Sequence, residues 1–240
     1  MPRLYVDLAL AAGQSLTLPP GPSRHVQVLR LQPGDGLVLF NGQGGEWAAT
    51  VTRMGRQAVD VRIDRHWDTA RELPRSVTLA VGMPANERMD ALVEKATELG
   101  AAAFMPLMCE RSVLRLSGER AQKKQAHWQA VAVAASEQCG RTRVPTVGPV
   151  QALRDALATI EAGTVRWVLS LRDDAMPLPQ ALRELPPGAS LVLLSGPEGG
   201  LSPAEEDLAR SLGHHPVNLG PRVLRADTAP LAVLAALAVA

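Results

Sequence analysis

Short apolar runs separated by tight-turn sequences fill the first part of the chain. Residues 37–40 and 46–51 flank the turn sequence Asn-Gly-Gln-Gly-Gly, and residues 58–63 alternate apolar and polar positions as a half-buried strand does. Three or more short strands joined by tight turns predict a small barrel or sheet. We expect this domain to span residues 1–70, with Pro74 close to the end of a linker.

After this point the periodicity changes, and strand-like apolar runs alternate with amphipathic helical segments. Ser202 and Glu205 form a capping-box pattern with Pro203 at the first helical position. Alternating strands and helices predict an α/β domain with a mostly parallel sheet over residues 74–240. The predicted strands are 77–81, 102–107, 165–171, 190–195 and 217–219, and the predicted helices are 87–99, 119–138, 178–185, 202–212 and 229–240.

The composition limits how the chain could contact nucleic acid. Aromatic residues make up 3% of the sequence and the formal net charge is +1, so neither stacked aromatics nor overall charge indicates RNA binding. The cations gather locally, however, because residues 105–145 hold seven basic side chains against three acidic ones, an excess of +4. We therefore expect an acidic partner to contact the middle of the chain.

The number of cysteines and the apolar runs near the two termini indicate the cellular compartment in which the protein is expected. Cys109 and Cys139 are too few for a disulfide framework. The first ten residues lack the apolar run of a signal peptide, and the longest apolar stretch, 229–240, is about half of the ~20 residues that cross a bilayer. We expect a cytoplasmic protein without a membrane segment, in which residues 229–240 form a buried helix.

The first candidate site is the segment 193–202, where an apolar strand ends in a glycine-rich loop before the capped helix. In open α/β sheets ligands bind beyond the carboxyl ends of strands, and glycine lets the backbone approach a ligand closely. The segment is neither a dinucleotide-binding fingerprint nor a P-loop. A simple turn of the chain explains the same residues equally well.

The second candidate site, residues 219–229, repeats the strand–loop–helix arrangement. Asp227 or Thr228 is available to cap the helix that follows. Arg222 and Arg225 could bind a phosphate or a carboxylate. Solvated arginines beside a capped helix are nevertheless the simpler interpretation of this segment alone.

Two further segments carry charged residues for which a structural explanation is at least as good as a functional one. Glu94 and Glu98 share one face of the predicted helix 87–99, as solvated residues above an apolar stripe commonly do. Gly140 can end the long helix 119–138, and Arg141 after it fits RNA contact and interaction with the helix dipole equally well.

Other chemistries have little support. His214 and His215 lack a Cys or His partner at zinc-ligand spacing, so we expect no metal. Cys109 and His127 are conceivable as the nucleophile and base of a hydrolase, but a buried structural thiol is the better interpretation. Ser195 follows a strand without the G-x-S-x-G pattern of a nucleophile elbow.

Several blocks of residues occur in order along nearly the whole chain. They are 25–30 (HVQVLR) with the Pro-Gly-Asp turn 33–35, 93–100 (VEKATELG), 110–112 (ERS), Glu137-Gln138 with Gly140-Arg141 and Val144-Pro145, 196–200 (GPEGG), and Leu219-Gly220 through Arg222 with Leu224, Arg225 and Thr228-Ala229. The last two are the most specific. Together these blocks resemble the RsmE family of 16S rRNA uridine-N3 methyltransferases, within the SPOUT superfamily of knotted methyltransferases.

The resemblance implies a PUA-like β-barrel followed by an α/β domain with a deep trefoil knot, in a homodimer whose knotted regions pack together. It implies S-adenosylmethionine as cofactor, bent among the knot loops and held by backbone groups, and 16S rRNA of the small subunit as substrate. The cofactor-binding residues that it implies are Leu171, Leu194, Ser195, Gly196, Pro197, Glu198, Gly199, Gly200, Leu219, Gly220, Val223, Leu224 and Thr228.

The implied reaction transfers a methyl group to N3 of a uridine. N3 carries a proton, so a base or a cation that stabilises the uridine anion is needed; we assign Glu198 as the pocket carboxylate and Arg222 or Arg225 as the anion stabiliser. N3 lies on the pairing edge of the base, so the target must be unpaired or flipped out. The expected RNA contacts are His25, Arg30, Arg88, Arg111 and Arg141.

One position departs from the family pattern. Relatives often carry a lysine in the segment before Arg88, where this chain has Ala85, so Ala85 is assigned no role. Two rival functions stay open: an enzyme of the same superfamily that methylates a ribose 2′-hydroxyl, and a non-catalytic RNA-binding or ribosome-assembly factor that kept the fold.

Overall fold

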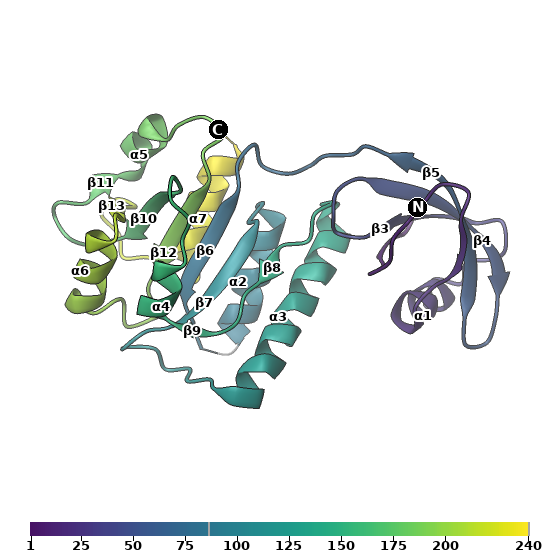
Figure 1. Ribbon diagram of the computed structural model, residues 1–240, viewed down its shortest axis with the longest axis horizontal. Helices are drawn as coiled ribbons and strands as arrows, with labels where there is room; N and C mark the ends of the chain where they lie inside the picture. Colours follow the sequence, from purple (N-terminus) through teal and green to yellow (C-terminus); the bar gives the residue numbers. More distant parts are fainter. Residues whose placement is uncertain (86, 240) are drawn as a thin grey trace. The chain divides into compact units, whose positions relative to one another are not determined.

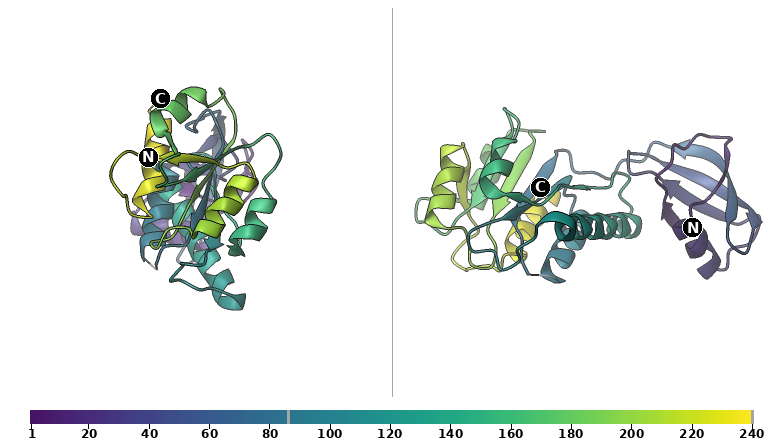
Figure 2. Two further views of the ribbon diagram at one scale, coloured as in Figure 1. Left: turned by 90° about the vertical axis from the view of Figure 1, so that its left-hand side faces the viewer. Right: turned by 60° about the horizontal axis from the view of Figure 1, so that its bottom comes forward.

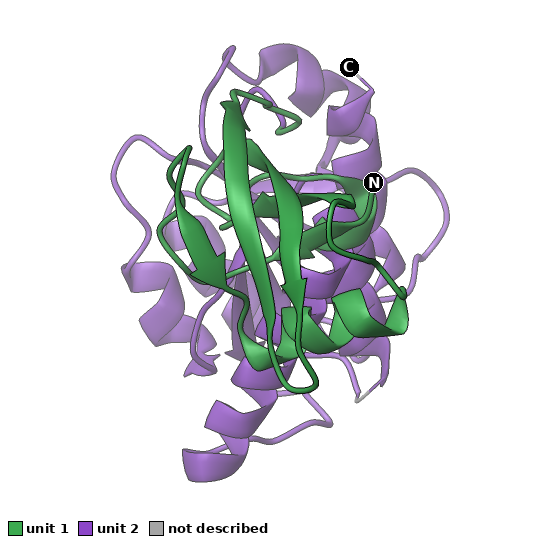
Figure 3. Cartoon of the chain, turned by 90° about the vertical axis from the view of Figure 1, so that its right-hand side faces the viewer, with its two compact units in different colours: residues 1–72, 136–144 green, residues 73–135, 145–240 purple. Residues whose placement is uncertain are grey.

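The computed structural model describes residues 1–85 and 87–239, which form two compact units (Figure 3). Unit 1 contains Met1–Glu72 and Ser136–Val144, and unit 2 contains the rest of the chain. The boundaries at residues 70 and 74 stay predictions. No sequence pattern indicates that Ser136–Val144 belongs with the N-terminal residues.

Unit 1 is built on a five-stranded sheet in the order β1-β3-β4-β5-β2. β1 and β3 pair parallel, and the other neighbours pair antiparallel. Its core contains Leu4, Val26, Leu39, Val61 and Ile63. The elements are β1 (Arg3–Tyr5), β2 (Ser15–Thr17), α1 (Pro20–Val28), β3 (Gly36–Phe40), β4 (Glu46–Met54) and β5 (Val59–Trp67).

The three predicted strands of unit 1 correspond to β3, β4 and β5, whereas α1 and the two short strands β1 and β2 were not predicted. α1 contains two prolines and buries only Ser23 and Val26. A helix with so narrow a buried face has no apolar stripe for a periodicity argument to detect.

A buried cluster of charged side chains holds the returning segment within unit 1. Arg3 donates from Nε to Glu46 Oε2 at 3.0 Å. Its two Nη atoms donate to the backbone oxygens of Ser136 and Arg141, at 2.8 and 2.6 Å. The Arg141 side chain pairs in turn with Glu72. Buried charges are tolerated when they are paired and hydrogen-bonded, and this network meets that condition.

Unit 2 is an α/β fold in which every strand pair is parallel. The strand order is β11-β13-β10-β12-β6-β7-β8, with β9 pairing β7. Its strands are β6 (Val77–Gly82), β7 (Ala103–Met108), β8 (Thr146–Val147), β9 (Gln151–Ala152), β10 (Val165–Leu169), β11 (Met176–Pro177), β12 (Leu191–Ser195) and β13 (His215–Asn218).

Helices cover both faces of this sheet (Figures 1 and 2). α2 packs against α7 on one face, and α4 packs against α6 on the other. All five residues of β12 are consequently buried, as expected for a central parallel strand. The helices are α2 (Glu87–Glu98), α3 (Gly118–Cys139), α4 (Leu153–Ala158), α5 (Leu178–Glu184), α6 (Pro203–Ser211) and α7 (Thr228–Ala238).

The structure confirms the capping box at α6, where Ser202 accepts from Glu205 N and the Glu205 side chain accepts from Ser202 N. It corrects three expectations. The strand predicted at 217–219 is β13, which begins at His215. The short elements α4, β8, β9 and β11 were not predicted. Asp227 occupies the N-cap position of α7 but its side chain makes no capping hydrogen bond.

Asn86, and Ala240 at the end of the predicted helix 229–240, lie outside the described residues. Within the described part of the chain, every helix is too short or too polar to cross a membrane.

His214, which follows α6, couples the stability of unit 2 to pH. It is 2% exposed, its Nδ1 donates to Ala209 O at 3.0 Å, and Nε2 has no hydrogen-bond partner among the described residues. Burial lowers the pKa of His214 from 6.5 to about 4. As pH falls through this window the unfolded chain takes up the proton first, so the free energy of unfolding decreases.

We therefore expect the free energy of unfolding to fall by on the order of 1–3 kcal/mol as the pH is lowered through this window. His214→Asn, whose amide can replace the Nδ1 donor, should flatten this dependence, whereas the exposed neighbour His215→Asn should keep it. Urea unfolding at several pH values measures the slopes. Equal slopes in all three proteins would contradict the assignment.

Candidate functional site

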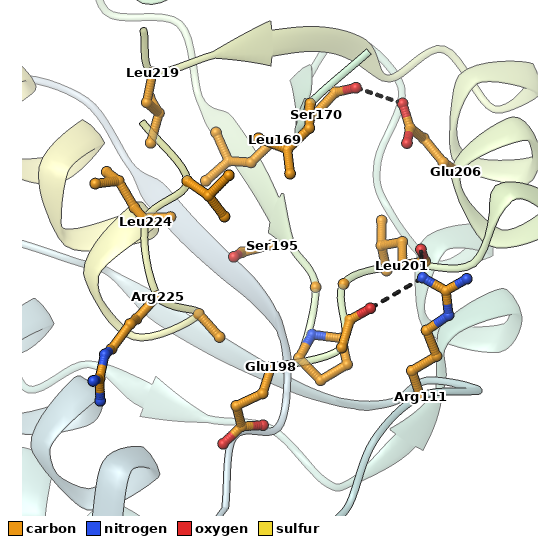
Figure 4. Close-up of a pocket in the computed structure, with 18 of the residues that line it drawn as sticks. Arg111, Leu169, Ser170, Ser195, Glu198, Leu201, Glu206, Leu219, Leu224 and Arg225 are labelled. Carbon is orange, nitrogen blue, oxygen red and sulfur yellow. Dashed lines mark hydrogen bonds between the residues drawn. The ribbon is translucent and has the colours of Figure 1, made fainter. Parts of the chain in front are cut away.

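A cavity of about 600 Å³ opens at one edge of the unit 2 sheet (Figure 4). Its walls come mainly from the loops after β10, β12 and β13, which are neighbouring strands. Because these strands are parallel, their carboxyl ends meet at the same edge and bring together segments far apart in sequence. Residues 169–172, 195–201 and 222–226 supply most of the lining, and Arg88, Arg111 and Glu206 reach it from other elements.

The loop after β12 folds tightly on itself, which explains its glycines. A Cβ on Gly196 would lie 2.7 Å from the backbone nitrogen of Leu201 and 2.9 Å from the carbonyl carbon of Gly200. Both are main-chain atoms that cannot move aside independently. The close approach therefore requires glycine at position 196.

Arg111 holds this glycine loop in place. Its Nη1 donates to the backbone oxygens of Gly199 and Leu201, at 3.0 and 3.3 Å (Figure 4). A Cβ on Gly199 would lie 3.0 Å from the Arg111 Cβ, so the two segments are in close contact. Arg111 was expected to contact RNA; the structure places its guanidinium on the carbonyls of the loop.

A carboxylate from α6 fixes the opposite wall. Glu206, whose side chain is 12% exposed, accepts from Ser170 Oγ at 2.7 Å and from Arg210 Nη2 at 3.0 Å. Glu206 Oε1 also lies 3.3 Å from Arg172 Nε. These bonds tie the loop after β10 to α6. The loop can therefore keep its shape without a ligand, as a preformed binding site does.

Glu198 lies in the cavity lining, as expected, and part of its carboxylate is already engaged. Oε1 accepts from the backbone nitrogen of Ala85 at 2.8 Å and lies 3.8 Å from Arg88 Nη1. Ala85, to which the sequence assigned no role, thus contributes its main chain. Glu198 joins the loop after β6 to the loop after β12, and its Oε2 forms no hydrogen bond or ion pair with the residues that the structure describes.

Arg222 and Arg225 differ from the other arginines of the cavity. Both side chains are exposed, and neither forms an ion pair or side-chain hydrogen bond with another residue that the structure describes. Each guanidinium is consequently free to meet an anionic group that enters the cavity.

Most of the predicted cofactor-binding residues line this cavity, although their roles stay predictions. Leu194, Gly220 and Thr228 do not line it. Leu194 is fully buried in the core formed with α4 and α6, so its side chain points into the protein interior. Thr228 is the exposed first residue of α7.

Sequence reasoning missed several lining residues. Outside both candidate segments these are Leu169, Ser170, Arg172, Glu206 and Val217, whereas Leu201, Ala226 and Ala229 lie within segments 193–202 and 219–229 but were assigned no role. Ser170 and Arg172 could have been found by extending to the strand 165–171 the rule that ligands bind beyond carboxyl ends. Glu206 could not, because only tertiary packing brings α6 beside that loop.

The other expected RNA contacts are spread over the two units. His25 on α1 and Arg30 after it are exposed in unit 1, and Arg88 lines the unit 2 cavity. Arg141 is 5% exposed and its guanidinium is paired with Glu72. A buried, paired arginine is not placed to contact a phosphate, so the structure does not support that role for Arg141.

The hydrolase alternative fails on Cys109. The thiol is 1% exposed, and burial, reinforced by the charge of Glu205, raises its pKa to about 12. It is therefore protonated at neutral pH, and the thiolate is the nucleophilic form. His127, the supposed base, contacts Asp90 at 2.9 Å instead.

Comparison with known proteins finds matches to RNA methyltransferases in both units. Residues 71–238 match the RNA methyltransferase domain family, and residues 23–64 match the RNA methyltransferase PUA domain family. The chain is 33% identical to ribosomal RNA small subunit methyltransferase E of Bacillus subtilis, over 88% of this chain and 84% of that protein. The corresponding Synechocystis protein is 34% identical, over 97% of this chain and 76% of the relative.

Solved structures agree with these sequence matches. Ribosomal RNA small subunit methyltransferase E from Neisseria gonorrhoeae, bound to S-adenosylmethionine, superposes with a TM-score of 0.91 at 36% identity, covering 99% of this chain and 96% of that one. A methyltransferase from Legionella pneumophila, also with bound cofactor, gives a TM-score of 0.88 at 33% identity, covering 98% and 96% of the two chains.

The contacts of Arg111 lead to a test of the loop. We expect Arg111→Ala to weaken S-adenosylmethionine binding about tenfold, because the loss of hydrogen bonds from a charged donor frees the glycine loop. Isothermal titration calorimetry measures the affinity. Arg120→Ala, at an exposed position on α3, is the matched control and should bind as the wild type does. An unchanged affinity in Arg111→Ala would refute a role in positioning the loop.

Proposed function

We propose, since this chain belongs to the RsmE family of small-subunit ribosomal RNA methyltransferases, that it transfers a methyl group from S-adenosylmethionine to N3 of a uridine in 16S rRNA. Family membership confirms the resemblance found in the sequence. It also confirms the fold class, a SPOUT methyltransferase domain after a PUA-like β domain. We expect the enzyme to act in the cytoplasm, where the small subunit is assembled.

The observation that carries the proposal is the preformed cavity at the carboxyl edge of the parallel sheet. Its lining fits S-adenosylmethionine in three respects. Loop 195–201 offers backbone groups that can hydrogen bond to a nucleoside. Leu169, Leu201 and Leu224 provide apolar walls for a purine, and the carboxylate of Glu198 can face a positive charge.

S-adenosylmethionine supplies an electrophilic methyl group on a positively charged sulfur when it is bound. The task of the protein is to hold the uridine so that N3 faces that methyl group in line, which alone contributes much of a rate enhancement. The loops that form the cavity are already fixed by Arg111, Glu198 and Glu206.

The N3 proton must leave, and two groups of this chain are placed to help. Glu198 has Oε2 available to accept a proton while Oε1 stays bonded to Ala85 N. Arg222 and Arg225 line the cavity and form no ion pair with another described residue, so either can stabilise negative charge on the uridine ring. We retain His25, Arg30 and Arg88 as candidate contacts to the RNA.

The reaction is tested by mapping methyl groups in 16S rRNA from cells with and without the gene. We expect one uridine mark to disappear in the deletion strain and to return with the wild-type gene. A methyl group on N3 blocks base pairing and stops reverse transcriptase at that nucleotide, whereas a ribose methyl group largely does not. A uridine mark that persists in the deletion strain would overturn the proposal.

The proposed role of Arg222 and Arg225 in stabilising the uridine anion is tested by kinetics with the purified enzyme. We expect Arg222→Ala or Arg225→Ala to lower kcat roughly 100-fold, the usual effect of removing a group that stabilises developing negative charge, while S-adenosylmethionine affinity changes little. Arg154→Ala, an exposed arginine on α4, should leave kcat unchanged. Loss of cofactor affinity in step with kcat would assign the residue to cofactor binding.

We further propose that the protein acts as a homodimer, as the family resemblance implies. Two apolar side chains in the cavity loops, Leu171 and Val223, are 72% and 77% exposed. Side chains of this kind are commonly covered by a partner.

One chain has a mass of 25.5 kDa, and light scattering on the purified protein should give twice this mass. We expect Leu171→Asp to shift the protein toward the monomer, because a charge in an apolar interface is costly. Leu8→Asp, at an exposed leucine in unit 1, should remain dimeric. A wild-type protein with the mass of a single chain at all concentrations would disprove the dimer.

A further inference from the structure

Unit 1 contains a second cavity, of about 480 Å³, that the proposed reaction does not use. Residues 7–10, after β1, form one side of it. The loop between β3 and β4 contributes Asn41, Gln43 and Gly44, and the sheet contributes Trp47 and His66. The cavity thus combines an aromatic surface with amide side chains in a β domain whose family match is to the PUA domain of RNA methyltransferases.

The aromatic surface is a cross-strand pair. Trp47 on β4 lies directly opposite His66 on β5 in the antiparallel ladder, and their ring centroids are 4.7 Å apart. Trp47 also packs against the core of unit 1, while His66 is exposed. The two ring planes are tilted by 46°. The Trp47 ring is therefore anchored and the His66 ring is exposed beside it, where a further planar ring can stack on it.

A glycine allows the histidine to lie where it does. A Cβ on Gly45 would be 2.2 Å from His66 Nε2, and Gly45 has φ of +70°. Both the space and the backbone conformation therefore exclude other residues without strain. The loop is shaped so that the His66 ring lies against it.

Polar groups surround this aromatic pair. Asn41 Oδ1 accepts from Gln43 N at 3.2 Å, which stabilises the turn and leaves the Asn41 amide nitrogen as a donor. The carboxamide of Gln43 offers both a donor and an acceptor, and Asp7 is the one acid among the described lining residues. Carboxamides and carboxylates of this kind can pair with the hydrogen-bonding edge of a nucleobase.

A cation lies next to Gly44, one of the residues that line the cavity. Arg143 Nη2 is 3.1 Å from the position of a Cβ on Gly44, and the side chain is exposed. No ion pair or side-chain hydrogen bond engages this guanidinium among the residues that the structure describes. It is thus available to a phosphate beside a base held in the cavity.

From these contacts we propose that the cavity binds one unpaired nucleobase of the RNA substrate, stacked on the His66–Trp47 pair, with its phosphate near Arg143. The inference rests on the proposed function, since it takes the RNA from there. Proteins that bind single-stranded RNA commonly combine stacking on aromatic rings with hydrogen bonds to the base edge.

The site can be mapped directly with the full-length protein. In a 16S rRNA transcript carrying 4-thiouridine, irradiation joins the thiobase to side chains it touches. Trypsin releases Trp47 within the peptide 31–53 and His66 within the peptide 66–71. We expect adducts on one or both peptides. Adducts confined to other parts of the chain would overturn the proposal.

Variants of His66 test the stacking. We expect His66→Ala to raise KM for 16S rRNA about fivefold or more with kcat little changed, because stacking on an aromatic side chain is worth ~1 kcal/mol or more per base. His66→Phe, which keeps a ring, should stay close to wild type. His215→Ala, an exposed histidine in unit 2, is the matched control. Trp47 is left in place because it packs against the core.

The outcomes separate this proposal from the proposed function. If the wild-type enzyme methylates rRNA and His66→Ala has an unchanged KM, the nucleobase site is wrong and the reaction stands. If His66→Phe is as impaired as His66→Ala, stacking is not the role of this side chain, and the proposal fails. If the wild-type enzyme neither binds nor methylates rRNA, both fail. Melting temperatures of the variants verify that each is folded.

Discussion

The parallel pairing of the unit 2 strands is the constraint on which the site depends. Because β13, β10, β12, β6 and β7 are neighbours that run in one direction, the loops that follow them must meet at one edge of the sheet. Parallel strands also require crossover connections, and the helices that make them cover both faces. The sheet is thereby buried, and the carboxyl edge is left as the place where irregular loops can form a cavity.

Charged side chains in this cavity serve two different purposes. Arg111, Glu198 and Glu206 bond to loop backbone or to neighbouring side chains and so fix the shape of the walls. Arg222 and Arg225 have no such partners among the described residues, so their charge remains available to a substrate. A preorganised electrostatic site needs both kinds, since groups that stabilise a transition state act best when the surroundings do not have to rearrange.

Unit 1 shows how a long-range contact can redefine a domain. The guanidinium of Arg3 bonds to the backbone of Ser136 and Arg141, and Glu72 accepts from the Arg141 side chain and from two backbone nitrogens after it. These bonds place the end of α3 and the following loop in the β domain. They also explain why a basic segment that resembles an RNA contact in the sequence is partly committed to structure, while Arg143 remains exposed.

The sequence by itself determined the β domain, the α/β domain, the capping box at Ser202 and the two strand–loop–helix segments at 193–202 and 219–229, because periodicity, turn residues and caps are local properties. The ordered motifs added the family. Only the tertiary structure decided that Glu206 and Arg111 fix the walls of the cavity, that Arg141 is buried, and that Trp47 and His66 face one another across two strands. Each of these depends on contacts between residues distant in the chain, whose partners no local pattern specifies.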